Sequence, residues 1–215
     1  MTLNDRCDDR PGGDFDAVMF DLLTALIDSW TLWNDAAGSP EDGRRWRAAY
    51  LELTYGAGPY RAYETIVAEA ADVAGIAPQC VAALSRRWLE LTPWPEADAT
   101  LAALARRAKL AVVTNCSIEL GRAAARRVYP RFDVVMTAEE AGFYKPRRAP
   151  YAKTLEMLGT TPQRTLFVAG SASDVPGAAA LGMPVYWHNR VGMPAVNDIA
   201  PTYHERSLDR LLELV

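Results

Sequence analysis

Short apolar runs recur along the chain, and stretches with apolar residues at helical spacing separate most of them. The runs have the length of strands and lie at residues 17–20, 110–113, 133–136, 165–168 and 184–187. The helical stretches lie at residues 101–107, 120–129, 151–158 and 175–181. Strands that alternate with such helices are typical of a parallel sheet covered on both faces. The pattern therefore predicts an α/β fold with a Rossmann-like parallel sheet flanked by helices.

Residues 29–95 break this pattern, because they contain no convincing strand. They hold helix candidates joined by clusters of glycine and proline, and these candidates span residues 45–54, 60–74 and 78–91. A helical insert directly after the first strand would lie over the carboxyl end of the sheet, where open α/β folds bind ligands. We therefore predict a core domain of residues 1–28 and 97–215 and an inserted helical cap domain of residues 29–96.

Composition and charge exclude some classes of partner. Half of the residues are hydrophobic and 23% are charged, which is ordinary for a globular protein. The formal net charge of −4 provides no field that would attract nucleic acid or an anionic membrane. Arginine pairs occur among acids and alanines, at residues 86–87, 106–107 and 126–127, and indicate solvated helix faces. The apolar runs are far too short to span a membrane. We expect neither nucleic acid nor a membrane as partner.

The cysteines and the first residues favour a cytoplasmic location. Cys7, Cys80 and Cys116 lack the spacing of a disulfide framework or a zinc site. A reducing cytoplasm fits this pattern, and Cys116 is expected to be a small buried thiol. Residues 1–16 are acidic and lack the apolar segment of a secretory signal, so we interpret them as a frayed leader.

Residues that could take part in catalysis or binding follow four of the predicted strands. Asp21 ends the first strand, Thr114 and Asn115 follow the second, Lys145 lies beyond the third, and Asp174 follows the fourth. The carboxyl ends of parallel strands lie at one edge of the sheet, so these side chains should share a crevice. A carboxylate there can act as a nucleophile or as a metal ligand. The histidines, His188 and His204, have no acid or serine at triad-like spacing and are expected to be surface or packing residues.

This order of residues resembles the haloacid dehalogenase (HAD) superfamily, and most closely its L-2-haloacid dehalogenase branch. Arg47, after Trp46, is similar to the substrate-binding arginine of that branch. Lys145 and the downstream Tyr151 resemble its lysine motif, and residues 167–174 its closing motif. Residues 187–190, Trp-His-Asn-Arg, match the segment after its final strand. The resemblance covers nearly the whole chain and implies a HAD core with a cap.

Two departures from the superfamily pattern argue against phosphatase activity. Superfamily phosphatases carry a general acid where this chain has Leu23 and a magnesium-binding acid where it has Gly170. Magnesium prefers hard oxygen ligands in octahedral geometry, and one of those carboxylates is missing. Without a metal, Lys145 would supply the positive charge beside Asp21. We therefore expect a metal-independent enzyme that needs no cofactor.

The resemblance implies a mechanism on a small carboxylic acid. Arg47 would bind the carboxylate, and Asp21 would displace the substituent at C2 to form an aspartyl ester, which water cleaves to a 2-hydroxy acid. Lys145 and Asp174 complete the catalytic set, with Asp174 orienting Lys145 or positioning the water. Some of the expected substrate-binding residues would donate hydrogen bonds to the negative charge that develops. The full set is Leu22 (through nearby backbone amides), Leu23, Thr114, Asn115, Ser171, Tyr151 and Trp30.

The leaving group stays open at this stage. The dehalogenase branch has tyrosine, asparagine and tryptophan at the positions of Leu23, Ser171 and Ser173, so parts of the usual halide cradle are absent. The superfamily also includes hydrolases that open azetidine-2-carboxylate, whose amine would suit the aromatic faces of Trp30 and Trp33. A third alternative is a non-catalytic binding protein of the same fold. Cap tyrosines could line a homodimer face, namely Tyr50, Tyr55, Tyr60 and Tyr63.

Overall fold

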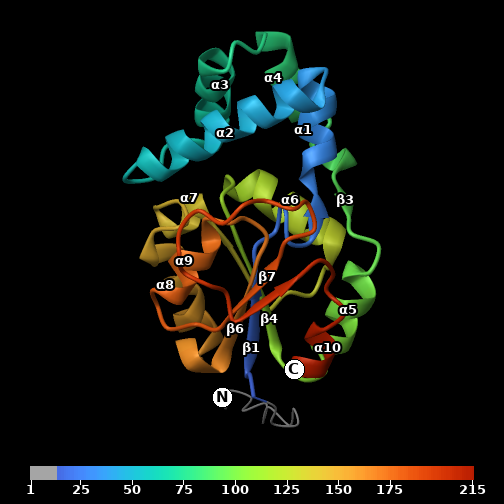
Figure 1. The fold of residues 1–215 in the computed structure, drawn as a ribbon, viewed down its shortest axis with the longest axis vertical. Helices are drawn as coiled ribbons and strands as arrows, with labels where there is room; N and C mark the ends of the chain where they lie inside the picture. Colours follow the sequence, from blue (N-terminus) through green and yellow to red (C-terminus); the bar gives the residue numbers. More distant parts are fainter. Residues whose placement is uncertain (1–13) are drawn as a thin grey trace, which may run out of the picture.

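The computed structural model describes residues 14–215, and Cys7 and most of the expected leader lie outside them. Within these residues one sheet of six strands has the order β5-β4-β1-β6-β7-β8, and every neighbouring pair is parallel (Figure 1). The strands are β1 (Ala17–Phe20), β4 (Lys109–Thr114), β5 (Val134–Thr137), β6 (Thr165–Ala169), β7 (Val185–His188) and β8 (Tyr203–Glu205). The predicted Rossmann-like parallel sheet is confirmed. The sequence pattern missed β8, which is short and only partly buried.

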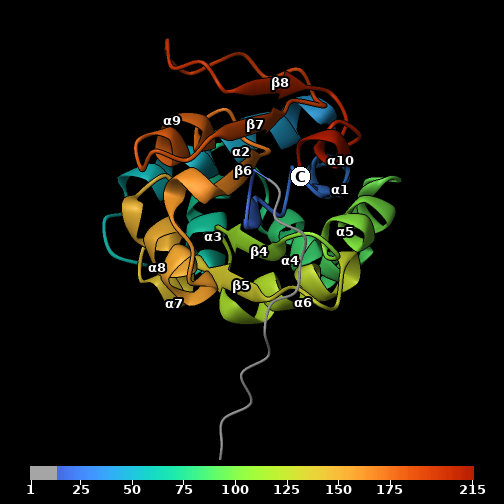
Figure 2. The same ribbon diagram turned by 90° about the horizontal axis from the view of Figure 1, so that it is seen from below.

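Helices cover both faces of this sheet (Figure 2). Alternate residues of β1 point to opposite faces, so Val18 and Phe20 join one apolar cluster while Ala17 and Met19 join the other. The first cluster includes residues of α5 (Ala97–Leu104), α6 (Ile118–Val128) and α10 (Leu211–Leu214). The second includes residues of α8 (Arg148–Leu158) and α9 (Asp174–Ala179). The short α7 (Ala138–Ala141) follows β5.

A helical layer lies beyond the carboxyl end of the sheet, at the top of Figure 1. It consists of α1 (Ser29–Ala37), α2 (Pro40–Gly56), α3 (Tyr63–Val73), α4 (Pro78–Arg86) and the 3-10 helix η1 (Trp88–Glu90). We refer to α1–α4 and η1 as the cap layer. Its two connections to the sheet pair with each other as antiparallel strands, β2 (Ile27–Asp28) and β3 (Thr92–Pro93).

The structure corrects two details of the expected cap. Residues 29–37 form α1, a helix of nine residues capped by the Asp28 side chain, which the sequence pattern missed. Residues 92–93 form a strand, although no convincing strand was expected between residues 29 and 95. A two-residue strand has no periodicity of its own, and backbone pairing alone defines it.

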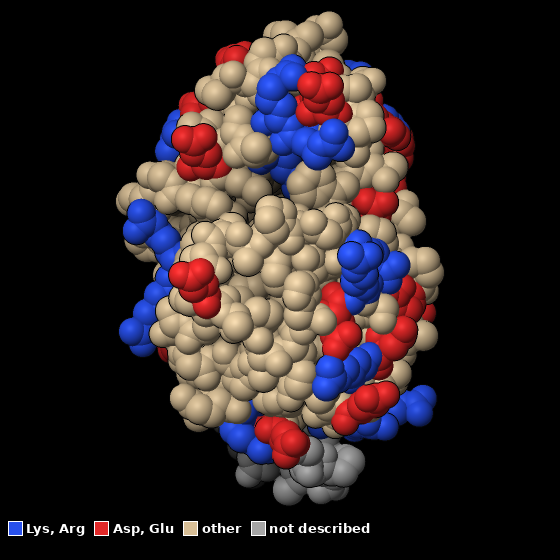
Figure 3. Space-filling model, viewed as in Figure 1, with Lys and Arg blue, Asp and Glu red and all other residues tan. Residues whose placement is uncertain are grey.

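The described surface carries mixed charges. Figure 3 shows Lys and Arg side chains next to Asp and Glu side chains around the edge of one face, with a broad uncharged area at its centre. Arg87 pairs with Asp35 and Glu90, and Arg122 pairs with Glu140. Within residues 14–215, no helix is both long and apolar enough to cross a membrane.

Candidate active site

Asp21 follows β1 directly, so its carboxylate lies at the carboxyl edge of the sheet. The chain then turns sharply, and this turn brings two backbone N–H groups back to the carboxylate. The amides of Thr24 and Ala25 donate to Asp21 Oδ2 over 3.2 and 3.3 Å. The side chain of Asp21 is 10% exposed, so one oxygen of a largely dehydrated carboxylate is held by two fixed donors.

Lys145 provides the positive charge beside this carboxylate. Its Nζ lies 2.7 Å from Asp21 Oδ1 and 2.9 Å from Asp174 Oδ2, and its side chain is 2% exposed. Burial alone would lower the pKa of Lys145, but the negative charges of Asp174 and Asp21 outweigh burial and raise that pKa. The ammonium therefore stays protonated between two carboxylates.

Asp174 is the second buried carboxylate of the site. Its Oδ1 accepts a hydrogen bond from the Tyr151 hydroxyl at 3.2 Å, and its Oδ2 accepts from Lys145. Burial raises the pKa of Asp174 to about 6, although the charge of Lys145 acts in the opposite direction. Asp174 thus orients Lys145, and its own ionisation falls near neutral pH.

Asn115 and Thr114 come from the end of β4. The Asn115 side chain bonds both backbone groups of Lys145, because its Oδ1 accepts from the amide at 2.7 Å and its Nδ2 donates to the carbonyl at 3.1 Å. Asn115 therefore fixes the lysine backbone. The Thr114 hydroxyl is 3.4 Å from the sulfur of Cys116. Cys116 is fully buried, as expected, and burial raises its pKa to about 12, so it is a poor nucleophile at neutral pH.

Arg47 reaches the site from α2 in the cap layer. Its guanidinium donates to the Ser29 and Thr24 hydroxyls, each at 2.7 Å, and lies 4.1 Å from the centre of the Trp30 ring. The residue is 7% exposed, and burial lowers its pKa while the charge of Asp21 opposes the change. A guanidinium has five N–H donors, so this one retains donors for a carboxylate.

These groups line one pocket, part of which opens to solvent. Its expected members are Asp21, Leu23, Arg47, Thr114, Asn115, Lys145, Ser171 and Asp174. The sequence reasoning missed its remaining members, which are Thr24, Tyr50, Leu51 and Tyr55. Their helical spacing from Arg47 along α2 could have revealed the last three, since residues three, four and eight positions further on share its face.

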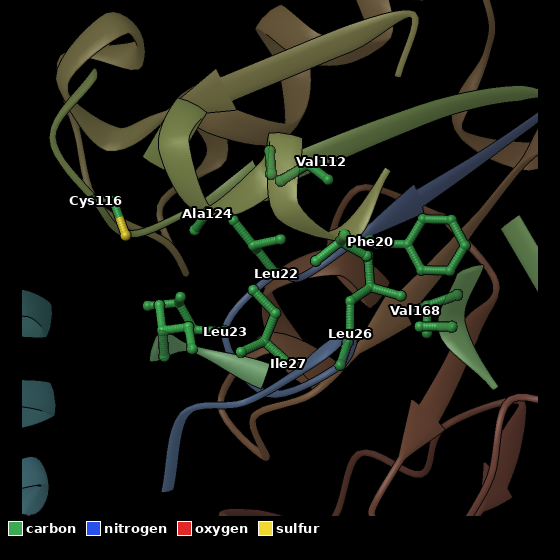
Figure 4. Packing of buried hydrophobic residues seen from close by; sticks show 14 of the residues in the cluster. Phe20, Leu22, Leu23, Leu26, Ile27, Val112, Cys116, Ala124 and Val168 are labelled. Carbon is green, nitrogen blue, oxygen red and sulfur yellow. The ribbon is translucent and has the colours of Figure 1, made fainter. Parts of the chain in front are cut away.

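The structure places other expected residues outside this pocket. The side chain of Leu22 is wholly buried in the core among Phe20, Ala124 and other apolar residues (Figure 4), because alternate positions point to opposite sides. Tyr151 is fully buried, and its hydroxyl donates to Asp174 from outside the pocket. Trp30 stacks on the guanidinium of Arg47, so its ring supports that residue and lines no part of the pocket.

The expected homodimer face also needs correction. Tyr50 and Tyr63 are 5% and 2% exposed, and they pack against each other and against Trp33 and Trp88 inside a single chain. Neither tyrosine is available on a surface for a second copy. The hydroxyl of Tyr50 instead donates to the Asn115 carbonyl at 2.8 Å and links the cap layer to the site.

The residues of the site do not fit magnesium. A Cβ atom at Gly170, where superfamily phosphatases are expected to have their metal-binding acid, would lie 2.2 Å from the Ala25 amide nitrogen and 2.6 Å from Asp21 Oδ2. A carboxylate side chain therefore has no space there. Lys145 occupies the position between the two remaining carboxylates. Residues 14–215 contain no group of three or more His, Cys, Asp or Glu side chains that could hold a metal ion.

Comparison with known proteins identifies relatives with two kinds of reaction. Haloacetate dehalogenase H-2 of Moraxella sp. (strain B) is 31% identical over 137 residues, which are 61% of this chain and 61% of that enzyme. The (S)-2-haloacid dehalogenase of Xanthobacter autotrophicus is 30% identical over 186 residues, 79% of this chain and 73% of that enzyme. Pyrimidine 5′-nucleotidase YjjG of Escherichia coli (strain K12) is 32% identical over 128 residues, 58% of this chain and 57% of that enzyme.

A solved structure agrees with the fold. The L-2-haloacid dehalogenase of Xanthobacter autotrophicus is 26% identical and superposes with a TM-score of 0.82, over 93% of this chain and 98% of that structure. The family description "haloacid dehalogenase-like hydrolase" matches residues 14–182, which contain all the residues that line the pocket. The chain belongs to the haloacid dehalogenase-like hydrolase family.

Proposed function

We propose that this protein is a metal-independent 2-haloacid dehalogenase that replaces the halogen of a small 2-haloacid with a hydroxyl group. The observation that carries the proposal is the position of Lys145, whose Nζ lies 2.7 Å from Asp21 Oδ1 inside the pocket that Arg47 also lines. The ammonium places a positive charge directly beside the attacking carboxylate in a site with little water. Arg47 supplies the complementary charge for the substrate carboxylate.

The first step forms an ester. With the substrate carboxylate on Arg47, Asp21 Oδ1 attacks C2 from the side opposite the halogen. The Oδ1–C2 bond forms as the carbon–halogen bond breaks, and the halide leaves with the bonding electrons. Asp21 Oδ2 becomes the ester carbonyl oxygen and remains bound by the amides of Thr24 and Ala25. Covalent catalysis divides one difficult displacement into two easier steps.

The second step regenerates the enzyme. Water adds to Cγ of Asp21, and negative charge develops on Oδ2, where the two amides stabilise it. The Cγ–Oδ1 bond then breaks, and the product keeps Oδ1 as its hydroxyl oxygen while Asp21 keeps the oxygen of water. The proton that water loses first neutralises the departing alkoxide, and a second proton goes to solvent from the new carboxyl group. Asp174 lines the pocket beside Lys145, and we assign it the role of positioning the water.

A second candidate reaction is opening of the strained ring of azetidine-2-carboxylate. One observation favours it: Tyr55 and Ser171 bring hydroxyl groups to the pocket, and a hydroxyl oxygen can accept a hydrogen bond from a protonated ring nitrogen. The relatives compared above give no support to this reaction.

A substrate comparison tests the proposal. L-2-chloropropionate, L-azetidine-2-carboxylate and p-nitrophenyl phosphate would each be incubated with the enzyme in a chelator and then with magnesium, with Asp21→Asn as control. We expect chloride release from the first compound in the chelator and none from the variant. Cleavage of the phosphate ester that depends on magnesium, with no turnover of either acid, would replace the proposal with a phosphatase. No turnover of any compound would favour a binding protein.

We also propose that the protein acts in the cytoplasm. Within residues 14–215 both cysteines, Cys80 and Cys116, are free thiols, which supports a reducing compartment. Association of two chains into a homodimer stays a prediction.

A further inference from the structure

Residues 187–190, which are the end of β7 and the two residues after it, match the family pattern but have no part in the mechanism above. His188 closes β7 and is fully buried. It lies directly behind the turn that binds the nucleophile, because its ring Nδ1 is 2.8 Å from the carbonyl oxygen of Ala25. Its other ring nitrogen, Nε2, lies 3.3 Å from Nε of Arg190. His188 therefore contacts the active-site turn from the side opposite Asp21.

The hydrogen-bond partners of His188 bear on its protonation state. A carbonyl oxygen only accepts hydrogen bonds, so Nδ1 must carry a hydrogen. The guanidinium of Arg190 only donates, which favours a lone pair on Nε2. Burial lowers the pKa of His188, although its hydrogen bonds to the backbone of Ala25 and Arg206 oppose this effect. The lowered pKa agrees with a neutral ring that carries its hydrogen on Nδ1.

Trp94 holds the neighbouring peptide group in the same way. Its indole N–H donates to the Thr24 carbonyl at 2.9 Å. That carbonyl and the Ala25 amide are the two ends of one peptide group, so Trp94 binds one end while Asp21 Oδ2 binds the other. Hydrogen bonds in series strengthen each other. The guanidinium of Arg190 lies 4.7 Å from the centre of the Trp94 ring and pairs with Glu96, which joins both supports.

We propose that His188 is a positioning residue, which together with Trp94 fixes the turn at residues 24–25 so that its amides bind Asp21 Oδ2 during hydrolysis of the ester. This inference rests on the proposed function. The two reaction steps differ in how they use the amides. Formation of the ester removes negative charge from Oδ2, whereas attack by water creates an oxyanion there. Loosening the turn therefore slows the second step and spares the first.

A pair of variants tests this difference. His188→Leu removes the donor, whereas His188→Asn keeps an amide nitrogen at the same number of bonds from Cα as Nδ1. We expect His188→Leu to slow ester hydrolysis by about 10- to 100-fold, because removal or displacement of such donors has effects of this order. The rate of halide release in the first turnover should not change. The ester on Asp21 should then accumulate in the mass spectrum of the intact protein, and His188→Asn should restore most of the rate.

Three results would overturn the proposal. The first is that His188→Leu slows halide release and ester hydrolysis equally. The second is that no ester accumulates in His188→Leu. The third is that His188→Asn is as slow as His188→Leu. Trp94→Phe keeps the ring and deletes only the donor to Thr24, so it tests the same turn if His188→Leu does not fold. His204→Gln is the control, because His204 stacks on Trp187 at the surface and does not contact the turn.

A second measurement does not depend on turnover. The sequence contains only two histidines, so the ¹⁵N spectrum of the imidazole rings can be assigned with the His204→Gln variant. We expect His188 to be neutral with its proton on Nδ1 at neutral pH. A protonated ring, or a proton on Nε2, would overturn the hydrogen-bond assignment. If the enzyme turned over none of the proposed substrates but His188 showed the Nδ1–H form, the proposed function would fail while the role of His188 in the turn would stand.

Discussion

Replacement of Lys145 by methionine tests the charge pairing at the centre of the site. Methionine has a similar length but no charge, so the change leaves Asp21 and Asp174 buried without the ammonium that they share. At an effective dielectric constant of about 20, each contact of 2.7 or 2.9 Å corresponds to about 6 kcal/mol of attraction before desolvation. Desolvation offsets much of this attraction. Removal of one partner from a buried pair typically lowers stability by about 3–5 kcal/mol, which is the loss that we expect near neutral pH.

The loss should depend on pH with a defined sign. Lys145 lowers the pKa of Asp174 against the effect of burial, so without Lys145 the pKa of that carboxyl rises further above its value in the unfolded chain. An acid whose pKa is raised in the folded state favours folding when it is protonated, and this contribution disappears as the pH rises through the folded pKa. The difference between Lys145→Met and the wild type should therefore be small at about pH 4 and largest above about pH 7.

Urea unfolding, followed by tryptophan fluorescence at several pH values, measures this difference. Lys153→Met is the matched control, because Lys153 is exposed and its Nζ donates to the Ala141 carbonyl at 3.0 Å. We expect the control to change the free energy of unfolding by less than about 1 kcal/mol at every pH. A loss in Lys145→Met that is below about 1 kcal/mol, or that does not vary with pH, would refute the pairing of Lys145 with two ionised carboxylates.

Three further predictions concern neighbouring groups. Arg47→Lys should lower kcat/KM by about 10- to 100-fold in a steady-state assay, since lysine cannot keep the paired hydrogen bonds of the guanidinium. Arg45→Lys, at an exposed position, is the control, and equal kcat/KM values for the two variants would contradict the prediction. Gly170→Ala should destabilise the protein by about 1–3 kcal/mol and abolish turnover, because its Cβ would lie 2.2 Å from a backbone nitrogen; an active variant of unchanged stability in thermal unfolding would disprove this packing. Tyr151→Phe removes a hydrogen bond that lowers the pKa of Asp174, so the acidic limb of the pH–rate profile should move to higher pH. If the limb did not move, the ionisation of Asp174 would not be the cause of that limb.

The sheet and the strand-end residues could be predicted from the sequence for a simple reason. Short apolar runs identify the buried strands, and parallel pairing then brings their carboxyl ends to one edge. Asp21, Lys145 and Asp174 lie together because each follows a different strand of that sheet. The family resemblance added Arg47, which no periodicity of the core could bring to this edge, since it belongs to a helix of the cap layer.

The remaining parts of the site depend on details that periodicity does not contain. The angle of α2 over the sheet determines that Tyr50 and Tyr55 enter the pocket, and that Trp30 stacks on Arg47 from outside it. Backbone amides near Leu22 were expected to stabilise developing charge, but the side chain of Leu22 itself points into the core. The amides of Thr24 and Ala25 approach Asp21 only because the chain turns directly after β1.

The central claim is that Asp21 forms an ester with the substrate, and a single turnover in water enriched in ¹⁸O tests it most directly. With enzyme in excess over substrate, the mechanism predicts that one heavy oxygen enters the carboxylate of Asp21 and that the first product contains unlabelled oxygen. The peptide that contains Asp21 would be analysed by mass spectrometry, with Asp21→Asn as the unlabelled control. Heavy oxygen found only in the hydroxyl group of the product would mean that water attacks C2 directly, and it would contradict the account.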